Sequence, residues 1–104
     1  MKENSKDASS FEVQQAERSR VTGPLDIATV TALLPLGSAA IGQGQASVID
    51  LAGVTSSDSA GLALLIEWLS VARAAKRTLR YENLPSQLLQ LARLSEVEEL
   101  LVAA

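Results

Sequence analysis

The sequence predicts a single α/β domain, in which a mixed and mostly parallel four-stranded β-sheet packs against about three α-helices. The best evidence lies in residues 48–77, where an apolar strand, a polar turn and the longest helical pattern of the chain follow one another. Segments with strand and helix periodicity alternate along the chain, which indicates crossover connections and parallel pairing. At 104 residues, the chain is long enough for one modest hydrophobic core and too short for two.

The composition is that of a globular protein and excludes several classes of function. Hydrophobic residues make up 47% of the chain and aromatic residues only 3%, so the core must consist mainly of aliphatic side chains. A net charge of −3 leaves no basic surface for nucleic acid or for an anionic membrane. The chain has no cysteine and no histidine, which removes thiolate chemistry, the usual zinc sites and every triad with an imidazole base. We therefore expect no enzyme activity, no metal site and no cofactor.

Charge and hydropathy predict where the domain begins and where the protein is located. Residues 1–10 are polar with mixed charge, which predicts a disordered leader in front of a domain over residues 11–104. This leader has no signal-peptide pattern, so we expect a cytoplasmic protein. Residues 27–49 are uncharged, but the proline and the glycines among them argue against a membrane span.

Two strands are expected in the first quarter of the chain. Phe11 and Val13 alternate with polar residues, which indicates a strand that is exposed on one side. A second strand is expected over residues 21–25, after a short turn at residues 17–19. Pro24 cannot donate a hydrogen bond to a neighbouring strand, so it favours an edge position or the end of this strand.

A short helix is expected next. Asp26 is a typical N-cap residue, and the apolar residues between positions 27 and 34 are spaced as on one face of a helix. Pro35 should end this helix, because proline lacks an N–H group and its ring clashes with the preceding turn. Residues 35–45 contain three of the six glycines and should form a loose connection, which leaves open another turn of helix around residues 39–41.

The second half of the chain contains two more pairs of strand and helix. The strand at residues 46–51 is apolar on both faces, as a central parallel strand should be. A strand at residues 78–83 and a helix at residues 84–97 end the fold, and the acidic residues in the last turns of that helix should make it fray. Between the two strands, the long helix from Ser59 to about Arg77 has an apolar stripe of Leu62, Leu65, Ile66 and Leu69.

The polar turn before the long helix is the best candidate for a functional site. Thr55 to Ser59 are five consecutive hydroxyl or carboxylate residues, whereas capping the helix requires only Asp58 or Ser59. The turn follows the carboxyl end of a central strand, where open α/β sheets usually bind ligands and partners. The small residues Ala60 and Gly61 would let another surface approach the backbone closely. A phosphate on Ser59 would lie in the positive field of the helix N-terminus.

Two motifs in this part of the chain carry a family resemblance. Gly23-Pro24-Leu25-Asp26 has the form Gly-x-Leu-Asp, and Asp58-Ser59-Ala60-Gly61-Leu62 has the form Asp-[Ser/Thr]-x-Gly-[Leu/Val]. With the strand Val48-Ile49-Asp50-Leu51 between them, they resemble the STAS domain, which is the fold of anti-sigma factor antagonists and related modules. The resemblance covers residues 11–97 and implies a STAS-like fold. It also implies that Ser59 occupies the family's phosphorylation and partner-docking position.

Within this family, the continuation D-S-A-G-L-A-L-L is most similar to the STAS subunit of the Mla phospholipid-transport ABC complex. The resemblance implies a non-enzymatic subunit that binds the cytoplasmic ATPase of the transporter and supports transport that maintains outer-membrane lipid asymmetry. It implies a location peripheral to the inner membrane, through a complex that includes a membrane permease. The expected docking surface consists of Ser57, Asp58, Ser59, Ala60, Gly61, Ala63, Glu67 and Trp68.

Three alternatives stay open in the sequence. Trp68 is either an interface anchor beside the apolar stripe or a tryptophan at the edge of the core. The alternative function is that of an anti-sigma factor antagonist regulated by phosphorylation of Ser59. Direct lipid binding is a third function, and it would require an apolar cavity that the sequence neither shows nor excludes.

Overall fold

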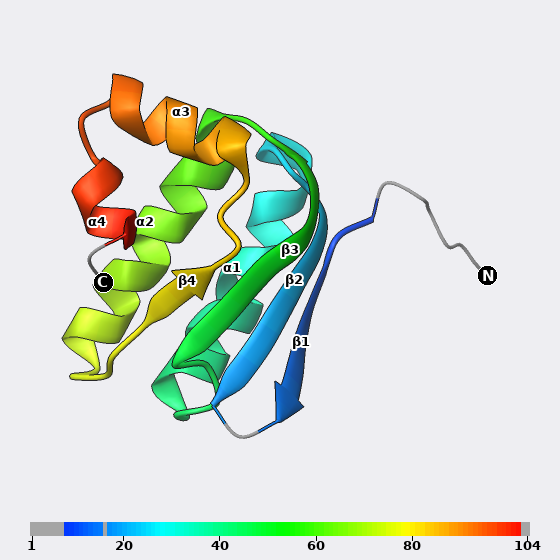
Figure 1. Cartoon of the computed structure of the whole chain (residues 1–104). Coiled ribbons are helices and arrows are strands. Elements are labelled where there is room, and N and C mark those ends of the chain that lie inside the picture. Colours follow the sequence, from blue (N-terminus) through cyan, green and yellow to red (C-terminus); the bar gives the residue numbers. More distant parts are fainter. Residues whose placement is uncertain (1–7, 16, 103–104) are drawn as a thin grey trace.

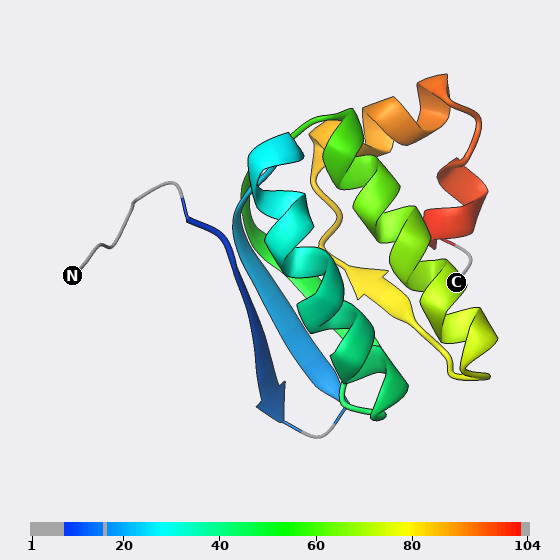
Figure 2. The same ribbon diagram turned by 180° about the vertical axis from the view of Figure 1, so that it is seen from behind.

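The computed structural model describes residues 8–15 and 17–102 and confirms the α/β fold class. Its two longest helices cover one face of a four-stranded sheet, which Figure 1 and Figure 2 show from opposite sides. Of the leader predicted at residues 1–10, residues 1–7 lie outside the described residues, whereas Ser10 already belongs to the first strand. The elements are β1 (Ser10–Gln15), β2 (Arg18–Leu25), α1 (Ile27–Gly42), β3 (Val48–Ser57), α2 (Ser59–Ala74), β4 (Arg80–Glu82), α3 (Ser86–Leu94) and α4 (Glu98–Val102).

The sheet is mixed and mostly parallel, as the sequence predicts. Its strand order is β1-β2-β3-β4, with β1 antiparallel to β2 and the other two pairs parallel. β2 is therefore an interior strand, so an edge position for Pro24 is wrong. Pro24 is instead close to the end of β2, where the register with β3 shifts and the ladder tolerates a residue without an N–H group.

The central strand β3 is longer than the sequence predicts and includes most of the polar turn. Ser56 and Ser57 pair with Pro24 and Leu25 of β2, so the ladder continues through residues expected to lie in a loop. These backbone hydrogen bonds do not depend on whether the side chains are polar. The polar composition of residues 55–57 is therefore a poor guide to where the strand ends. Only Asp58 separates β3 from α2.

The first helix continues through Pro35 to Gly42, so the prediction that Pro35 ends it is wrong. Proline removes one hydrogen bond to the carbonyl of Thr31, but both residues lie on the exposed side of α1, where water can replace that bond. The opposite side of the helix is buried beyond the proline, at Gly37, Ala40 and Ile41. Packing of this side against the core compensates for the missing bond.

The predicted C-terminal helix is divided into α3 and α4. Glu96 has a φ angle of 60° in the turn between them, a conformation that no α-helix contains. Glu98 and Glu99 consequently lie in the first turn of α4, the end of a helix that favours carboxylates. The expectation that these acids occupy unfavourable last turns is therefore wrong, because it assumed one continuous helix.

Trp68 joins the two long helices in the interior of the domain. It is fully buried, and its indole N–H donates a hydrogen bond of 3.2 Å to the carbonyl of Leu34 in α1. The indole ring fills the space beside Gly37, where a Cβ atom would lie only 2.3 Å from the ring. Phe11 of β1 meets the same ring edge to face, with 5.5 Å between centroids. Gly37 is thus required for close packing between α1 and α2.

We expect Gly37→Ala to destabilise the protein by about 1–3 kcal/mol, because the new methyl group overpacks the contact with Trp68. In an unconstrained helix, the same change would stabilise by up to about 1 kcal/mol. Gly42→Ala is the matched control in α1, since no atom lies within 4 Å of the position that its new methyl group would take. Urea unfolding of the two variants measures the difference. Equal stabilities would show that the Trp68 contact does not constrain the helix pair.

Candidate functional site

The N-terminus of α2 is capped by the carboxylate of Asp58. Its Oδ1 atom accepts hydrogen bonds from the backbone N–H groups of Ala60 at 2.8 Å and Gly61 at 3.4 Å. Asp58 has extended backbone angles, as an N-cap residue should, so Ser59 is the first residue of the helix. The choice that the sequence left between Asp58 and Ser59 as the cap is settled in favour of Asp58.

Ser59 presents a hydroxyl group to solvent at this terminus. The residue is exposed, and within the described part of the chain its hydroxyl forms no hydrogen bond. Since Asp58 already satisfies the cap, the hydroxyl of Ser59 has no structural task in the helix. It is available to a partner or to a modifying enzyme.

Two predicted docking residues, Ser57 and Gly61, are buried and serve the fold instead. Gly61 packs on the end of β2, where a Cβ atom would lie 2.8 Å from the Cβ of Leu25. Ser57 is 7% exposed, and its backbone N–H donates to the side chain of Gln87 in α3 at 3.0 Å. Position 61 therefore requires a glycine because of a contact inside the protein. This corrects the interpretation that Gly61 leaves space for a partner.

Trp68 must also be removed from the predicted docking surface. It is 0% exposed, so no partner can reach it without separating α1 from α2. Of the two interpretations that the sequence left open, the structure supports a core position, and the tryptophan lies at the centre of the core. The interface interpretation was wrong because Phe11 of β1 and Leu34 of α1 cover the side of α2 on which Trp68 lies. The sequence of α2 alone does not reveal these contacts.

The exposed members of the predicted surface form a continuous strip along α2. Ser59, Ala63 and Glu67 are spaced by four residues and all are exposed, so they follow one side of the helix over about two turns. Asp58 is exposed at the start of this strip, and Ala60 is partly exposed beside it. The structure therefore brings together on one surface most of the small and polar residues that the sequence selected.

A further exposed residue, Ile27, lies at the same edge and was not predicted. It is the first residue of α1 and is 78% exposed, so it presents a large aliphatic side chain to solvent. The backbone N–H of Asp58 donates to the carbonyl of Leu25 at 3.2 Å, which links the ends of β2 and β3 just before the two helices begin. Figure 2 shows these helix starts side by side. We call the exposed surface of Ile27, Asp58, Ser59, Ala63 and Glu67 the docking face.

Each of the two helices at the docking face has an aspartate at its N-terminus. Asp26 accepts from the backbone of Ala28 at 3.0 Å and Thr29 at 3.1 Å, while the side chain of Thr29 bonds back to the N–H of Asp26. This capping box and the cap at Asp58 satisfy the first N–H groups of both helices. The face thus combines a free hydroxyl, an exposed isoleucine and acidic groups, which suits the binding of a protein surface better than bond-making chemistry.

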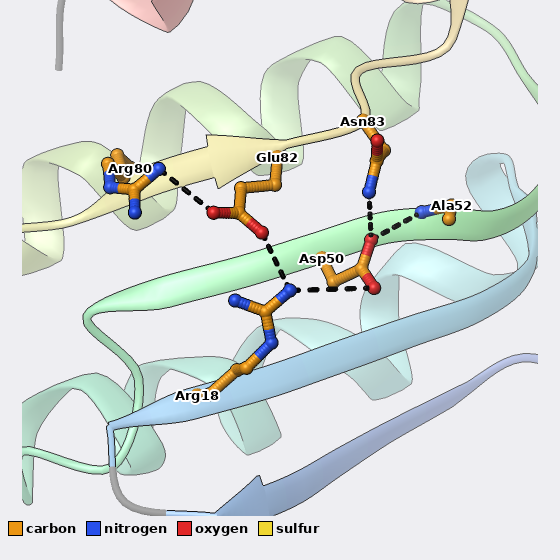
Figure 3. A network of polar contacts seen from close by, with 6 residues as sticks. All are labelled: Arg18, Asp50, Ala52, Arg80, Glu82 and Asn83. Carbon is orange, nitrogen blue, oxygen red and sulfur yellow. Dashed lines mark hydrogen bonds and ion pairs between the residues drawn. The ribbon is translucent and has the colours of Figure 1, made fainter.

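A second polar cluster lies on the face of the sheet opposite the helices (Figure 3). Arg18 of β2 donates to Glu82 of β4 at 2.6 Å, and Arg80 forms an ion pair with the same carboxylate at 3.0 Å. Asp50 of β3 accepts from the side chain of Asn83 and from the backbone of Ala52, both at 2.9 Å. The cluster connects three strands through its own members, so it stabilises the sheet and leaves few groups for a ligand.

The pKa values in this cluster shift in the direction that stabilises its charged forms. The hydrogen bond from Asn83 and the backbone N–H of Ala52 lower the pKa of Asp50. The hydrogen bond from Arg18 lowers the pKa of Glu82, and the same contact raises the pKa of Arg18. Opposite charges and donated hydrogen bonds both favour an ionised carboxylate.

Residues 8–15 and 17–102 contain neither a metal-binding cluster nor a membrane-spanning helix. No group of three or more carboxylate, histidine or cysteine side chains there could hold a metal ion. None of the helices in these ranges combines the length and the hydropathy needed to cross a membrane.

Comparison with known families identifies the class of protein. The family described as "Mlab, STAS domain" matches residues 11–103, which is nearly the whole chain. The protein therefore belongs to the STAS domain family, and the matching member of that family is the one described as MlaB. No curated protein matches the sequence significantly.

Solved structures confirm the STAS fold. The anti-sigma factor antagonist SpoIIAA in its unphosphorylated form is similar with a TM-score of 0.69 and 20% identity, over 91% of this chain and 86% of that chain. The Bacillus cell fate determinant SpoIIAA in its phosphorylated form is similar with a TM-score of 0.65 and 21% identity, over 86% of this chain and 85% of that chain. At these identities the similarity concerns the fold.

The lowered pKa values predict how stability depends on pH. A carboxylate whose pKa is lower in the folded state stabilises the fold above its ordinary pKa, which is 3.8 for Asp50 and 4.5 for Glu82. This contribution is lost as the pH falls through these values toward the lowered ones. We expect the free energy of unfolding to fall in that range, and to fall less in Asp50→Asn, which keeps an acceptor but cannot be protonated. Urea titrations at a series of pH values would contradict this if both proteins had the same pH dependence.

Proposed function

We propose that the protein is a non-enzymatic subunit that docks on the cytoplasmic ATPase of an ABC transporter through the docking face. The transporter moves phospholipids and maintains the lipid asymmetry of the outer membrane. The observation that carries the proposal is the exposed strip of Ser59, Ala63 and Glu67 beside Ile27, in a chain that matches the MlaB description over nearly its whole length. The protein would be located in the cytoplasm, at the inner membrane, through a complex that includes a permease.

The composition of the docking face supports a protein partner. Ala63 and the first turn of α2 have small side chains, so a helix or loop of the ATPase can lie close to the backbone of α2. Ile27 provides an apolar side chain that is 78% exposed and would gain most from burial by a partner. Asp58 and Glu67 provide acidic groups at the two ends of the strip, which would favour basic side chains on the ATPase.

A second candidate function is that of an anti-sigma factor antagonist regulated by phosphorylation of Ser59. The observation that favours it is the free, exposed hydroxyl of Ser59 at a helix N-terminus, in a fold similar to SpoIIAA. A phosphate there would be stabilised by the helix dipole and opposed by the adjacent carboxylate of Asp58. The intact mass after incubation with a partner kinase and ATP separates the two functions, since a protein without phosphate on Ser59 would exclude regulation of this kind.

Coexpression with the tagged cognate ATPase tests the leading proposal. We expect wild-type protein to copurify with the ATPase, and Ser59→Glu or Ala63→Arg to reduce recovery about tenfold or more, because each replaces a small side chain of the strip with a long charged one that keeps the partner away from the backbone of α2. Ala74→Arg is the matched control, since it introduces the same side chain at an exposed alanine at the other end of α2. Undiminished recovery of Ser59→Glu and Ala63→Arg, or an equal loss with Ala74→Arg, would contradict the proposed surface.

A further inference from the structure

A groove lies at the C-terminal end of α2, between this helix and α4. Its volume is about 480 Å³, which is in the range of binding pockets. Its lining is mostly apolar and includes Leu69, Leu79 and Leu100, together with the charged residues Arg73, Arg77 and Glu99.

The apolar part of the groove is held open by the packing of α4. Leu101 is 1% exposed and fixes α4 to the core, whereas its neighbour Leu100 lines the groove and is 44% exposed. Ala72 and Leu79 are buried beneath the groove, so an occupant would meet a firm apolar floor. A leucine kept so exposed on a short, well-anchored helix is available for contact with another molecule.

The borders of the groove carry opposite charges. Arg73 and Arg77 line it from the side of α2, and Glu99 lines it from α4. Arg77 donates to the carbonyl of Gly42 at 3.3 Å, and Glu98, beside Glu99, pairs with Arg93 at 3.0 Å. Among the described residues, no carboxylate lies within ion-pair distance of Arg73 or Arg77, so both guanidinium groups can pair with an acidic group of an occupant.

We propose that this groove binds an amphipathic helix of a partner protein. Such a helix would place its apolar side on Leu69 and Leu100, an acidic side chain beside Arg73, and a basic side chain beside Glu99. Because the groove presents both Arg73 and Glu99, it suits an occupant with both charges better than a purely anionic one. An anionic lipid would gain from the arginines but would be repelled by Glu99.

The groove is a second interaction surface. Its residue Arg73 and Ser59 of the docking face lie near opposite ends of α2, which is about 24 Å long from its 16 residues. The two surfaces meet in the middle of the helix, where Glu67 of the docking face follows Ile66 of the groove. A test of the groove that uses no ATPase does not depend on the proposed function.

Fluorescent peptides of about four helical turns test the proposal with the full-length protein. All have leucines along one side; the first has glutamates on one flank and lysines on the other, the second only glutamates, and the third only lysines. Measured by fluorescence anisotropy at about 0.15 M salt, the mixed peptide should bind wild-type protein most tightly. Arg73→Glu replaces one of the two cations with a carboxylate, so binding of the mixed peptide should weaken and binding of the lysine peptide should strengthen. Peptides that bind equally, or not at all, would overturn the proposal.

A pair of leucine variants controls for general effects of an added charge. Leu100→Glu should weaken binding of the mixed peptide about tenfold or more, because it places a carboxylate in the apolar part of the groove. Leu94→Glu adds the same charge at an apolar residue of α3 that is 82% exposed and does not line the groove, and it should leave binding unchanged. Thermal unfolding verifies that both variants are folded. An equal loss of binding in the two variants would show that the groove is not the binding surface.

Discussion

Trp68 holds α1 and α2 together, and the arrangement of the rest of the domain depends on this contact. Its ring occupies the space beside Gly37, its N–H bonds to the carbonyl of Leu34 at 3.2 Å, and Phe11 of β1 meets its edge. One side chain thus connects the first strand with both long helices. Because the helices follow neighbouring parallel strands, this packing places their N-termini at the same edge of the sheet and creates the docking face.

The residues of α2 divide into those that hold the domain together and those that a partner can reach. Gly61, Leu65 and Trp68 are buried against β2, the sheet and α1, whereas Ser59 and Ala63 are exposed on the other side. The cap is made by Asp58, so a change at Ser59 leaves the hydrogen bonds of the helix terminus intact. A substitution or modification on the docking face can therefore alter binding at little cost in stability.

Local sequence patterns predicted the elements but not the contacts between distant segments. The helix α2 and the cap at Asp58 follow from spacing and side-chain chemistry within a few residues. Of the predicted apolar stripe, Leu62 and Leu65 are buried, whereas Ile66 and Leu69 are only partly buried. The buried side of the helix continues instead through Trp68 and Ala72. The continuation of α1 past Pro35 depends on burial of the far half of that helix, and the burial of Trp68 depends on the glycine across from it in α1. The ion pair between Arg18 and Glu82 joins residues 64 positions apart, and no periodicity could reveal it.

We propose that the partner binds where α1 and α2 begin. Hydrogen–deuterium exchange of the protein, free and in complex with the cognate ATPase, measures this directly. We expect slower exchange in the complex at the start of α1 and over residues 58–67, with the uncovered face of the sheet unchanged. Protection confined to that face, around Arg18 and Glu82, with unchanged exchange over residues 58–67, would contradict it.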